Sequence, residues 1–203
     1  MPNLRVVLID NFDSFTFNLV DLFERAAEHL AVELDLQVRR PDATSVAQIE
    51  ADDFDAAILS PGPGAPQDAH LCLALLQCWR DRKPVFGVCL GHQTMGLALG
   101  ATIVRGSKPV HGKVFQVLHA GQGCLAGLPQ PLMAMRYHSL CVQHTNLPSE
   151  IEVTAALADG TVMALRGGGF EGVQFHPESI GTPDGLRLAL NVLRGWLPAL
   201  RAR

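Results

Sequence analysis

The sequence predicts an α/β fold, with a mostly parallel central sheet, helices on both faces and an appended antiparallel portion. In the first half, short apolar runs alternate with segments of helical periodicity, as in chains that build parallel sheets through right-handed crossovers. In the second half, strand-like runs follow one another with turn residues such as Asp159 and Gly160 between them. The chain has 203 residues, of which 48% are hydrophobic, and no repeat or linker, so we expect one domain over residues 1–203.

The elements of the first half follow in order. Short apolar or alternating runs predict strands at 5–10, 32–40, 55–60 and 84–89. The segments after the first, third and fourth of these runs predict helices at 15–30, 69–82 and 92–100. Ser14 precedes the first helix and is its candidate N-cap. A strand, a helix and the next strand therefore repeat along the chain.

The second half has a different pattern. Strand-like runs occur at 101–106, 113–120, 152–165 and 170–175, and a closing helix is expected at 184–197. The Asp159-Gly160 pair and the glycine run at 167–169 are turn signals between runs, which favours antiparallel pairs joined by hairpins.

The charge pattern excludes two classes of partner. The chain has 16 basic and 20 acidic residues, a formal net charge of -4, and no long run of one sign. Nucleic acids and anionic membranes attract clustered positive charge, so neither is an expected partner. No stretch reaches the roughly 18 apolar residues of a membrane span, and Asp10 interrupts the N-terminal apolar run. We expect a cytoplasmic protein.

The five cysteines are odd in number and scattered, which indicates reduced thiols in a chain too large to need disulfides. None forms a C-x-x-C pair, and only His92 lies near Cys89, so we expect no metal site. The phosphate-binding G-K-[ST] pattern and the G-x-G-x-x-G dinucleotide pattern are both absent. No cofactor is therefore predicted.

Cys89 lies where an expected strand meets an expected helix. The residues Gly87 to Gly91 have the G-x-nucleophile-x-G form of a nucleophile elbow, in which the glycines let neighbouring backbone approach. The free N–H groups at the start of the following helix favour a thiolate at this position. A buried cysteine can also be a small packing residue, and this is our interpretation of the cysteines outside the elbow: Cys72, Cys78, Cys124 and Cys141.

A thiolate nucleophile needs a base, and the base needs an orienting group. His176 and Glu178 are two positions apart in an expected extended segment, so their side chains point to the same side. Spacing alone leaves open whether this pair is catalytic or lies on a solvated loop. His92 and His138 are rival bases, although neither has an acidic neighbour suited to orient it.

The segment 60–66, Ser-Pro-Gly-Pro-Gly-Ala-Pro, is too irregular for a strand or helix. Its prolines fix the backbone and its glycines leave N–H groups uncovered. It can be a plain loop, or a rigid wall that presents backbone donors to a substrate carbonyl. Gly62, Pro63 and Gly64 are therefore candidate substrate-binding residues.

Six motifs together resemble the class I (triad) glutamine amidotransferases, specifically the glutaminase subunit (component II) of anthranilate synthase and aminodeoxychorismate synthase. They are LIDNFDSFTFNL, LSPGPGAP, PVFGVCLGHQ, PVHGK, RYHSL and EGVQFHPESI, and the resemblance covers residues 6–193. It implies that the chain hydrolyses L-glutamine to glutamate and ammonia through a cysteinyl thioester. The ammonia would pass to a chorismate-binding partner subunit, which makes anthranilate, 4-amino-4-deoxychorismate or both.

The resemblance also implies roles for individual residues. Cys89, His176 and Glu178 would form the catalytic triad, and Gly62 and Leu90 would supply the N–H groups of the oxyanion hole. The amino-acid end of glutamine would be held by Gln93, Ser139 and Leu140. We expect the partner to contact the segments 11–16 and 109–113 around the site. Alternatives are a glutaminase for another synthase, a catalytically silent regulatory subunit, and a cysteine peptidase.

Overall fold

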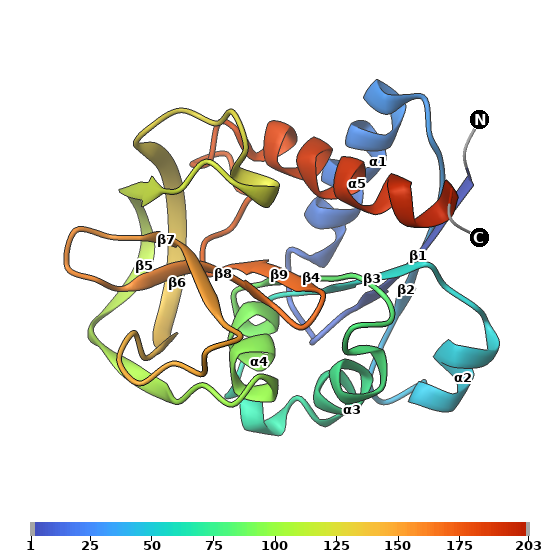
Figure 1. Ribbon diagram of the computed structural model, residues 1–203, viewed down its shortest axis with the longest axis horizontal. Coiled ribbons are helices and arrows are strands. Elements are labelled where there is room, and N and C mark those ends of the chain that lie inside the picture. Colours follow the sequence, from blue (N-terminus) through green and yellow to red (C-terminus); the bar gives the residue numbers. More distant parts are fainter. Residues whose placement is uncertain (1–2, 202–203) are drawn as a thin grey trace.

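The computed structural model describes residues 3–201, apart from the side chains of 107–109 and 198–201. Over this part of the chain, nine strands form one sheet in the order β2-β1-β3-β4-β9-β8-β7-β5-β6 (Figure 1). The parallel strands are β1 (Asn3–Ile9), β2 (Glu33–Arg39), β3 (Ala56–Leu59), β4 (Val85–Val88) and β9 (Phe170–Val173). The antiparallel strands are β8 (Val162–Gly167), β7 (Glu152–Ala156), β5 (Ile103–His119) and β6 (Leu132–Val142). The predicted fold class is confirmed.

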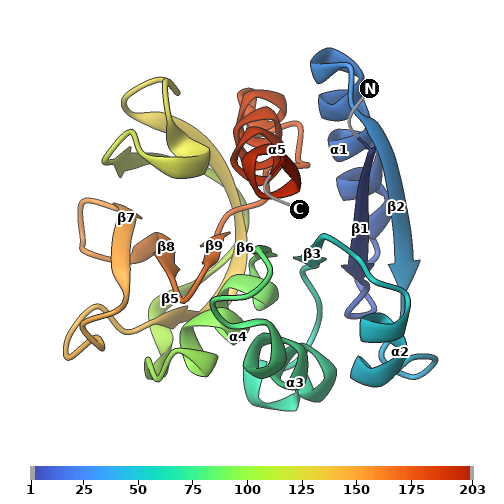
Figure 2. The ribbon, with the colours of Figure 1, turned by 45° about the vertical axis from the view of Figure 1, so that its right-hand side comes forward.

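Helices cover both faces of the parallel strands (Figure 1, Figure 2). One face packs against α1 (Thr16–Leu30) and α5 (Gly185–Arg201), and the other against α2 (Val46–Ala51), α3 (His70–Trp79) and α4 (Leu90–Ala98). Short 3-10 turns occur at Pro66–Asp68 and Gly123–Leu125. On the first face, the Phe23 ring lies edge-on to Phe86 with centroids 6.0 Å apart, and stacks on Trp196 at 6.2 Å. These aromatic contacts join α1, β4 and α5 into one core.

The predicted cap of α1 is wrong. The side chain of Ser14 does not cap the helix, which begins at Thr16. Instead, Asp10 Oδ1 accepts hydrogen bonds from Thr16 Oγ1 at 2.7 Å and from the Asp13 amide at 3.1 Å. Asp10 directly follows β1, so the segment between strand and helix is held from the strand end. This fixes the shape of a loop that lines the site described below.

The two strands expected at 101–106 and 113–120 are one strand, β5, and the segment 109–113 belongs to it rather than to a loop. The side chain of residue 109 lies outside the described residues. The pairing with β6 shifts register between Arg105 and Val110 and again between His111 and Lys113. The strand continues through Gly106, Pro109 and Gly112 because these residues lie at the bulges, although glycine and proline usually indicate a turn.

Two elements were not predicted. Helix α2 follows a capping box in which Ser45 Oγ accepts from the Gln48 amide and the Gln48 side chain accepts from the Ser45 amide. Strand β6 contains the RYHSL motif and pairs with β5 along its length. No helix between residues 3 and 201 combines the length and apolar character that crossing a membrane requires.

Candidate active site

Four parallel strands end at one edge of the sheet, where ligands bind in folds of this class. The segments that follow β1, β3, β4 and β9 line a cavity of about 480 Å³ there, together with β6 and the start of α1. The residues lining it are Asp13, Phe15, Asn18, Pro61, Gly62, Cys89, Tyr137, His176, Glu178, Ser179 and Ile180. Cys89, His176, Glu178 and Gly62 are thus brought to one cavity from distant parts of the sequence.

Cys89 occupies a strained turn between β4 and α4. Its φ of 51° and ψ of -98° lie in a region that non-glycine residues rarely adopt. A Cβ atom at Gly91 would collide with the carbonyl oxygen of Leu59, and one at Gly87 with Met95 and the first turn of α4. Both glycines are therefore needed for the close approach of backbone that this turn requires. The turn places the sulfur at the cavity and Leu90 at the first position of α4, where a helix leaves its N–H groups without partners inside the helix.

His176 and Glu178 form a buried pair beside Cys89. The distance from His176 Nδ1 to Glu178 Oε1 is 2.6 Å, and the two side chains are 8% and 3% exposed. Burial alone lowers the pKa of His176, but its interaction with the Cys89 sulfur, together with its hydrogen bond and charge interaction with Glu178, outweighs burial and raises its pKa to about 10. The Glu178 carboxylate thus favours the protonated form of the imidazole, in the cavity that Cys89 also lines.

The backbone around His176 is tied to β6. The His176 amide donates to the Met135 carbonyl at 3.0 Å. Thr182 Oγ1 joins the two segments by donating to the His176 carbonyl and accepting from the Met135 amide. The Tyr137 ring stands edge-on to the imidazole, with ring centroids 5.3 Å apart. The ring of His176 is thus held from the antiparallel portion of the sheet as well as by Glu178.

The proline-glycine loop after β3 is clamped to the loop after β1. The Asn11 amide donates to Ser60 Oγ at 2.8 Å, and Asn11 Nδ2 donates to the Ser60 carbonyl at 3.0 Å. Both residues are buried. A Cβ atom at Gly62 would lie 2.7 Å from the Asn11 Cβ and overlap the Asn11 carbonyl oxygen. Glycine at position 62 therefore allows the loop to approach Asn11 and still line the cavity.

The remaining candidate residues lie around this cavity rather than on its wall. Pro63 and Leu90 line a neighbouring cavity of about 340 Å³, whereas Gly64 lines neither and has a φ of 87°. Gln93 is buried, and its Nε2 donates to the Leu140 carbonyl at 2.9 Å. Ser139 is exposed on β6. The structure thus joins Gln93 to Leu140 but leaves Ser139 outside the cavity.

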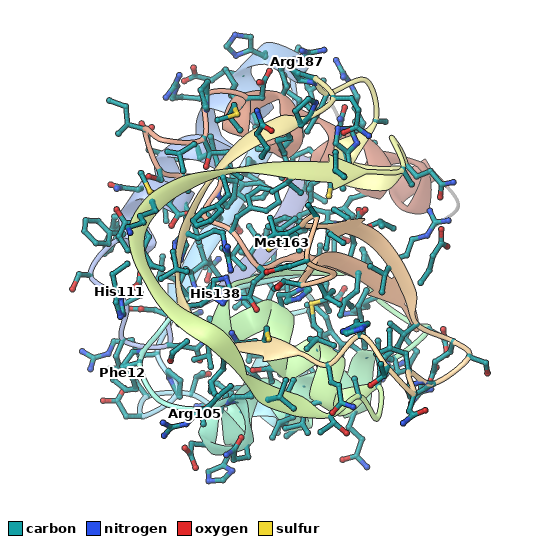
Figure 3. All side chains as sticks on the ribbon, turned by 90° about the vertical axis from the view of Figure 1, so that its left-hand side faces the viewer. Phe12, Arg105, His111, His138, Met163 and Arg187 are labelled. Atoms are coloured by element: carbon teal, nitrogen blue, oxygen red, sulfur yellow. The ribbon has the colours of Figure 1, made fainter. Side chains whose placement is uncertain are left out.

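The rival histidines do not line the cavity. His92 is fully buried on α4, and burial lowers its pKa to about 3. Burial and the Arg136 charge lower the pKa of His138 to about 4, and Figure 3 shows this residue inside the curve of β5. Burial also raises the pKa of the Cys72 thiol to about 12 and that of Cys124 well above its usual value. Burial thus favours the neutral form of each of these groups, whereas the pKa of His176 is raised.

Sequence reasoning did not single out three residues near the sulfur. Asp13 and Tyr137 line the cavity, and Gln174 Nε2 lies 3.6 Å from Cys89 Sγ. For Gln174 a signal existed, because it precedes His176 by two positions, as Glu178 follows it by two, and extended backbone points all three to one side. For Asp13, nothing in the spacing indicated that the loop after β1 bends over the cavity.

The arrangement suits acyl transfer to sulfur. It combines a cysteine in a strand-to-helix elbow, an imidazole hydrogen-bonded to a carboxylate, and a proline-glycine loop that lines the same cavity. The protein-family model for glutamine amidotransferase class-I matches residues 7–195. The chain belongs to this family. Its Cys89, His176 and Glu178 lie in the part of the chain that the family model covers.

Relatives of this amidotransferase include two named synthase proteins. Anthranilate synthase component 2 of Azospirillum brasilense is 45% identical over 192 residues, which are 93% of this chain and 94% of that protein. Aminodeoxychorismate synthase of Streptomyces griseus is 48% identical over 193 residues, again 93% of this chain, but the chain spans only 25% of its length. Some relatives thus contain a region like this chain within a much longer protein.

A solved structure has the same fold. The chain superimposes on a putative GMP synthase component from Thermoplasma acidophilum with a TM-score of 0.80, covering 98% of this chain and 96% of that one. The identity is 24%, so the likeness extends to the amidotransferase fold and no further.

Proposed function

We propose that this chain is the glutaminase subunit of a chorismate-using synthase and acts as a single amidotransferase domain in the cytoplasm. It hydrolyses L-glutamine and delivers the ammonia to a chorismate-binding subunit that makes anthranilate, 4-amino-4-deoxychorismate or both. The observation that carries the proposal is the cavity that joins the Cys89 elbow to the His176–Glu178 pair. The synthase names of the two relatives support the choice of partner.

In the proposed reaction, the Cys89 thiolate attacks the side-chain amide carbon of glutamine. The negative charge that develops on the amide oxygen is stabilised by the N–H groups of Gly62 and Leu90. The His176 imidazolium donates its proton to the departing nitrogen, so ammonia leaves and a γ-glutamyl thioester remains. His176, now neutral, takes a proton from water, which attacks the thioester and releases glutamate. Glu178 holds the imidazole in orientation and stabilises its cationic form.

The amino-acid end of glutamine is proposed to lie near Gln93, Ser139 and Leu140. Gln93 Nε2 is occupied by the Leu140 carbonyl and by Gln174 Oε1, at 2.9 and 3.1 Å. The Gln93 side chain therefore has only its carbonyl oxygen left to bind a substrate, and this oxygen can accept from the substrate ammonium group. Ser139 is exposed and accessible to the substrate carboxylate.

The partner subunit is proposed to cover the mouth of the cavity. Large apolar side chains are exposed around it: Phe15 is 58% exposed, Ile180 99% and Tyr137 43%, and all three line the cavity. Phe12, 49% exposed, lies at the same edge of the molecule as His111 of β5 (Figure 3). Exposed apolar side chains gathered around a cavity are typical of a protein interface. Covering the mouth of the cavity would also keep ammonia from escaping to water.

Replacing Cys89 by alanine tests the proposal. With the chorismate-binding subunit present, Cys89→Ala should abolish synthesis from glutamine but retain synthesis from an ammonium salt, because the partner needs only ammonia. Cys78→Ala, a half-buried thiol outside the cavity, is the matched control and should retain both. Loss of both activities in Cys89→Ala would indicate that the partner subunit itself is inactive in the assay. Glutamine-dependent synthesis that survives in Cys89→Ala would refute the proposed nucleophile.

A further inference from the structure

Gln174 has no role in the mechanism above, yet it is the side chain that donates to the proposed nucleophile. It follows β9, is fully buried, and its Nε2 lies 3.6 Å from Cys89 Sγ. Burying an amide is unfavourable unless both its donor and its acceptor are used. Both the NH₂ and the carbonyl oxygen of the Gln174 side chain therefore need hydrogen-bond partners.

The orientation of this amide follows from a chain of fixed partners. The Leu140 carbonyl can only accept, so the group of Gln93 that faces it at 2.9 Å must be its NH₂. The same NH₂ lies 3.1 Å from the Gln174 side chain, so the Gln174 atom that faces it must be the oxygen. The NH₂ of Gln174 is then left to face the Cys89 sulfur. A flipped amide at either glutamine would place two donors or two acceptors together.

The end of this series of hydrogen bonds that lies farther from the sulfur is also held by fixed partners. His138 Nδ1 lies 2.8 Å from the Leu140 carbonyl, and Arg136 Nε donates to His138 Nε2 at 3.0 Å. Because Nε2 accepts, Nδ1 of the neutral imidazole carries the hydrogen and donates to Leu140. Arg136 stacks over the Phe115 ring, 4.4 Å from its centroid. Five side-chain and backbone groups thus form a buried path from Arg136 to the sulfur.

We propose that Gln174 is a positioning residue that directs a side-chain N–H at the Cys89 sulfur and holds it as a thiolate. The thiol can donate its S–H to the Tyr137 carbonyl, 3.7 Å away. Once that proton is lost, the same carbonyl oxygen faces a negative charge and repels it. The Gln174 amide supplies a donor to balance this repulsion, and Gln93 prevents the amide from rotating. The inference rests on the proposed nucleophilic role of Cys89.

The test is the pH profile of Cys89 alkylation by iodoacetamide, followed by mass spectrometry of the Cys89 peptide. Only the thiolate reacts, so the profile reports its fraction. In Gln174→Met, which keeps the length of the side chain but removes the amide, the midpoint should rise by about one pH unit, as for loss of one hydrogen bond to a charged group. The control Gln143→Met removes a half-buried glutamine that bonds to Thr145 and should leave the midpoint unchanged.

Other titratable groups face the sulfur, and the control separates their effects. His176 and Glu178 follow β9, Asp13 lies across the cavity, and Tyr137 comes from β6. His92 and His138 are buried behind them and neutral. All remain in both variants, so a rise confined to Gln174→Met is assigned to the amide. An unchanged midpoint in folded Gln174→Met overturns the proposal.

A second measurement uses the unaltered chain, should Gln174→Met not fold. The side-chain ¹⁵N–¹H₂ signals of Gln174 should shift with pH at the alkylation midpoint, and this shift should vanish in Cys89→Ala. Signals that do not respond to Cys89 ionisation overturn the proposal. Neither measurement requires glutamine, chorismate or a partner. A failure of the proposed glutaminase function is therefore distinguishable from a failure of this inference.

Discussion

A methyl group added at Gly62 should disable the proposed oxyanion hole without removing any catalytic side chain. A Cβ atom there would lie 2.7 Å from Asn11 Cβ and 3.1 Å from Leu90 Cδ2, and would overlap the Asn11 carbonyl oxygen. Asn11 is buried and hydrogen-bonded to Ser60, so it cannot move away from the added methyl group. The loop after β3 must therefore shift, and the Gly62 N–H shifts with it.

The expected magnitude is that of one lost oxyanion donor. Such a loss lowers kcat by about 10²–10³, or roughly 3–4 kcal/mol of transition-state stabilisation, and leaves KM for glutamine nearly unchanged because the donor acts on charge that develops only during reaction. The overlap should also lower the free energy of unfolding by about 1–3 kcal/mol, the usual cost of overpacking.

Steady-state glutaminase kinetics in the presence of the chorismate-binding subunit measure this effect. Gly195→Ala is the matched control, because a Cβ atom at that helical position meets nothing within 4 Å. It should retain full kcat. Synthesis from an ammonium salt should persist in both variants, because the partner needs only ammonia. A Gly62→Ala enzyme with unchanged kcat, or with a change confined to KM, would refute the assignment of Gly62 to the oxyanion hole.

Two further predictions concern the histidines. Glutaminase turnover should fall far more in His176→Ala than in His92→Ala or His138→Ala, and the loss in Glu178→Ala should be smaller than in His176→Ala. If His92→Ala were inactive and His176→Ala active, the base would be misassigned. Burial lowers the pKa of His92 to about 3, so the unfolded chain, with an ordinary imidazole pKa of about 6.5, binds more protons as pH falls below that value. His92 should therefore cost about 2 kcal/mol of stability between pH 7 and pH 5. Urea unfolding should show that loss, and His92→Met should be less pH-sensitive by this amount; equal sensitivity in both proteins would contradict the argument.

The parallel half of the fold could be predicted because its signals are local. Each of its strands except the second is a short apolar run, and each crossover helix but α2 is long enough to show its periodicity. Helix α2 has six residues, too few for a periodic pattern, although Ser45 and Gln48 carry a readable capping box. The N-cap of α1 was misassigned because Asp10, six positions before Thr16, reaches the helix start only after the loop has folded.

The antiparallel half was harder to predict because polar residues occupy its interior. Strand β6 alternates between buried and exposed positions, but two of the buried ones are Arg136 and His138, so no hydrophobic alternation is visible in the sequence. Their burial is possible only because Phe115 and Leu140 come close in space. In the same way, the sequence placed Cys89, His176 and Glu178 at strand ends, whereas the contact of Gln174 with the sulfur depends on the pairing of β4 with β9.

That pairing of β4 with β9 also has a consequence for the order in which the protein is made. Cys89 and Gln174 are 85 positions apart, and β9 is the last strand of the sheet to leave the ribosome. A nascent or truncated chain that ends before β9 contains the proposed nucleophile, but it lacks the proposed base and the strand that pairs with one edge of β4. Under the proposed function, glutamine hydrolysis would be withheld until synthesis is nearly finished, so incomplete chains would not release ammonia.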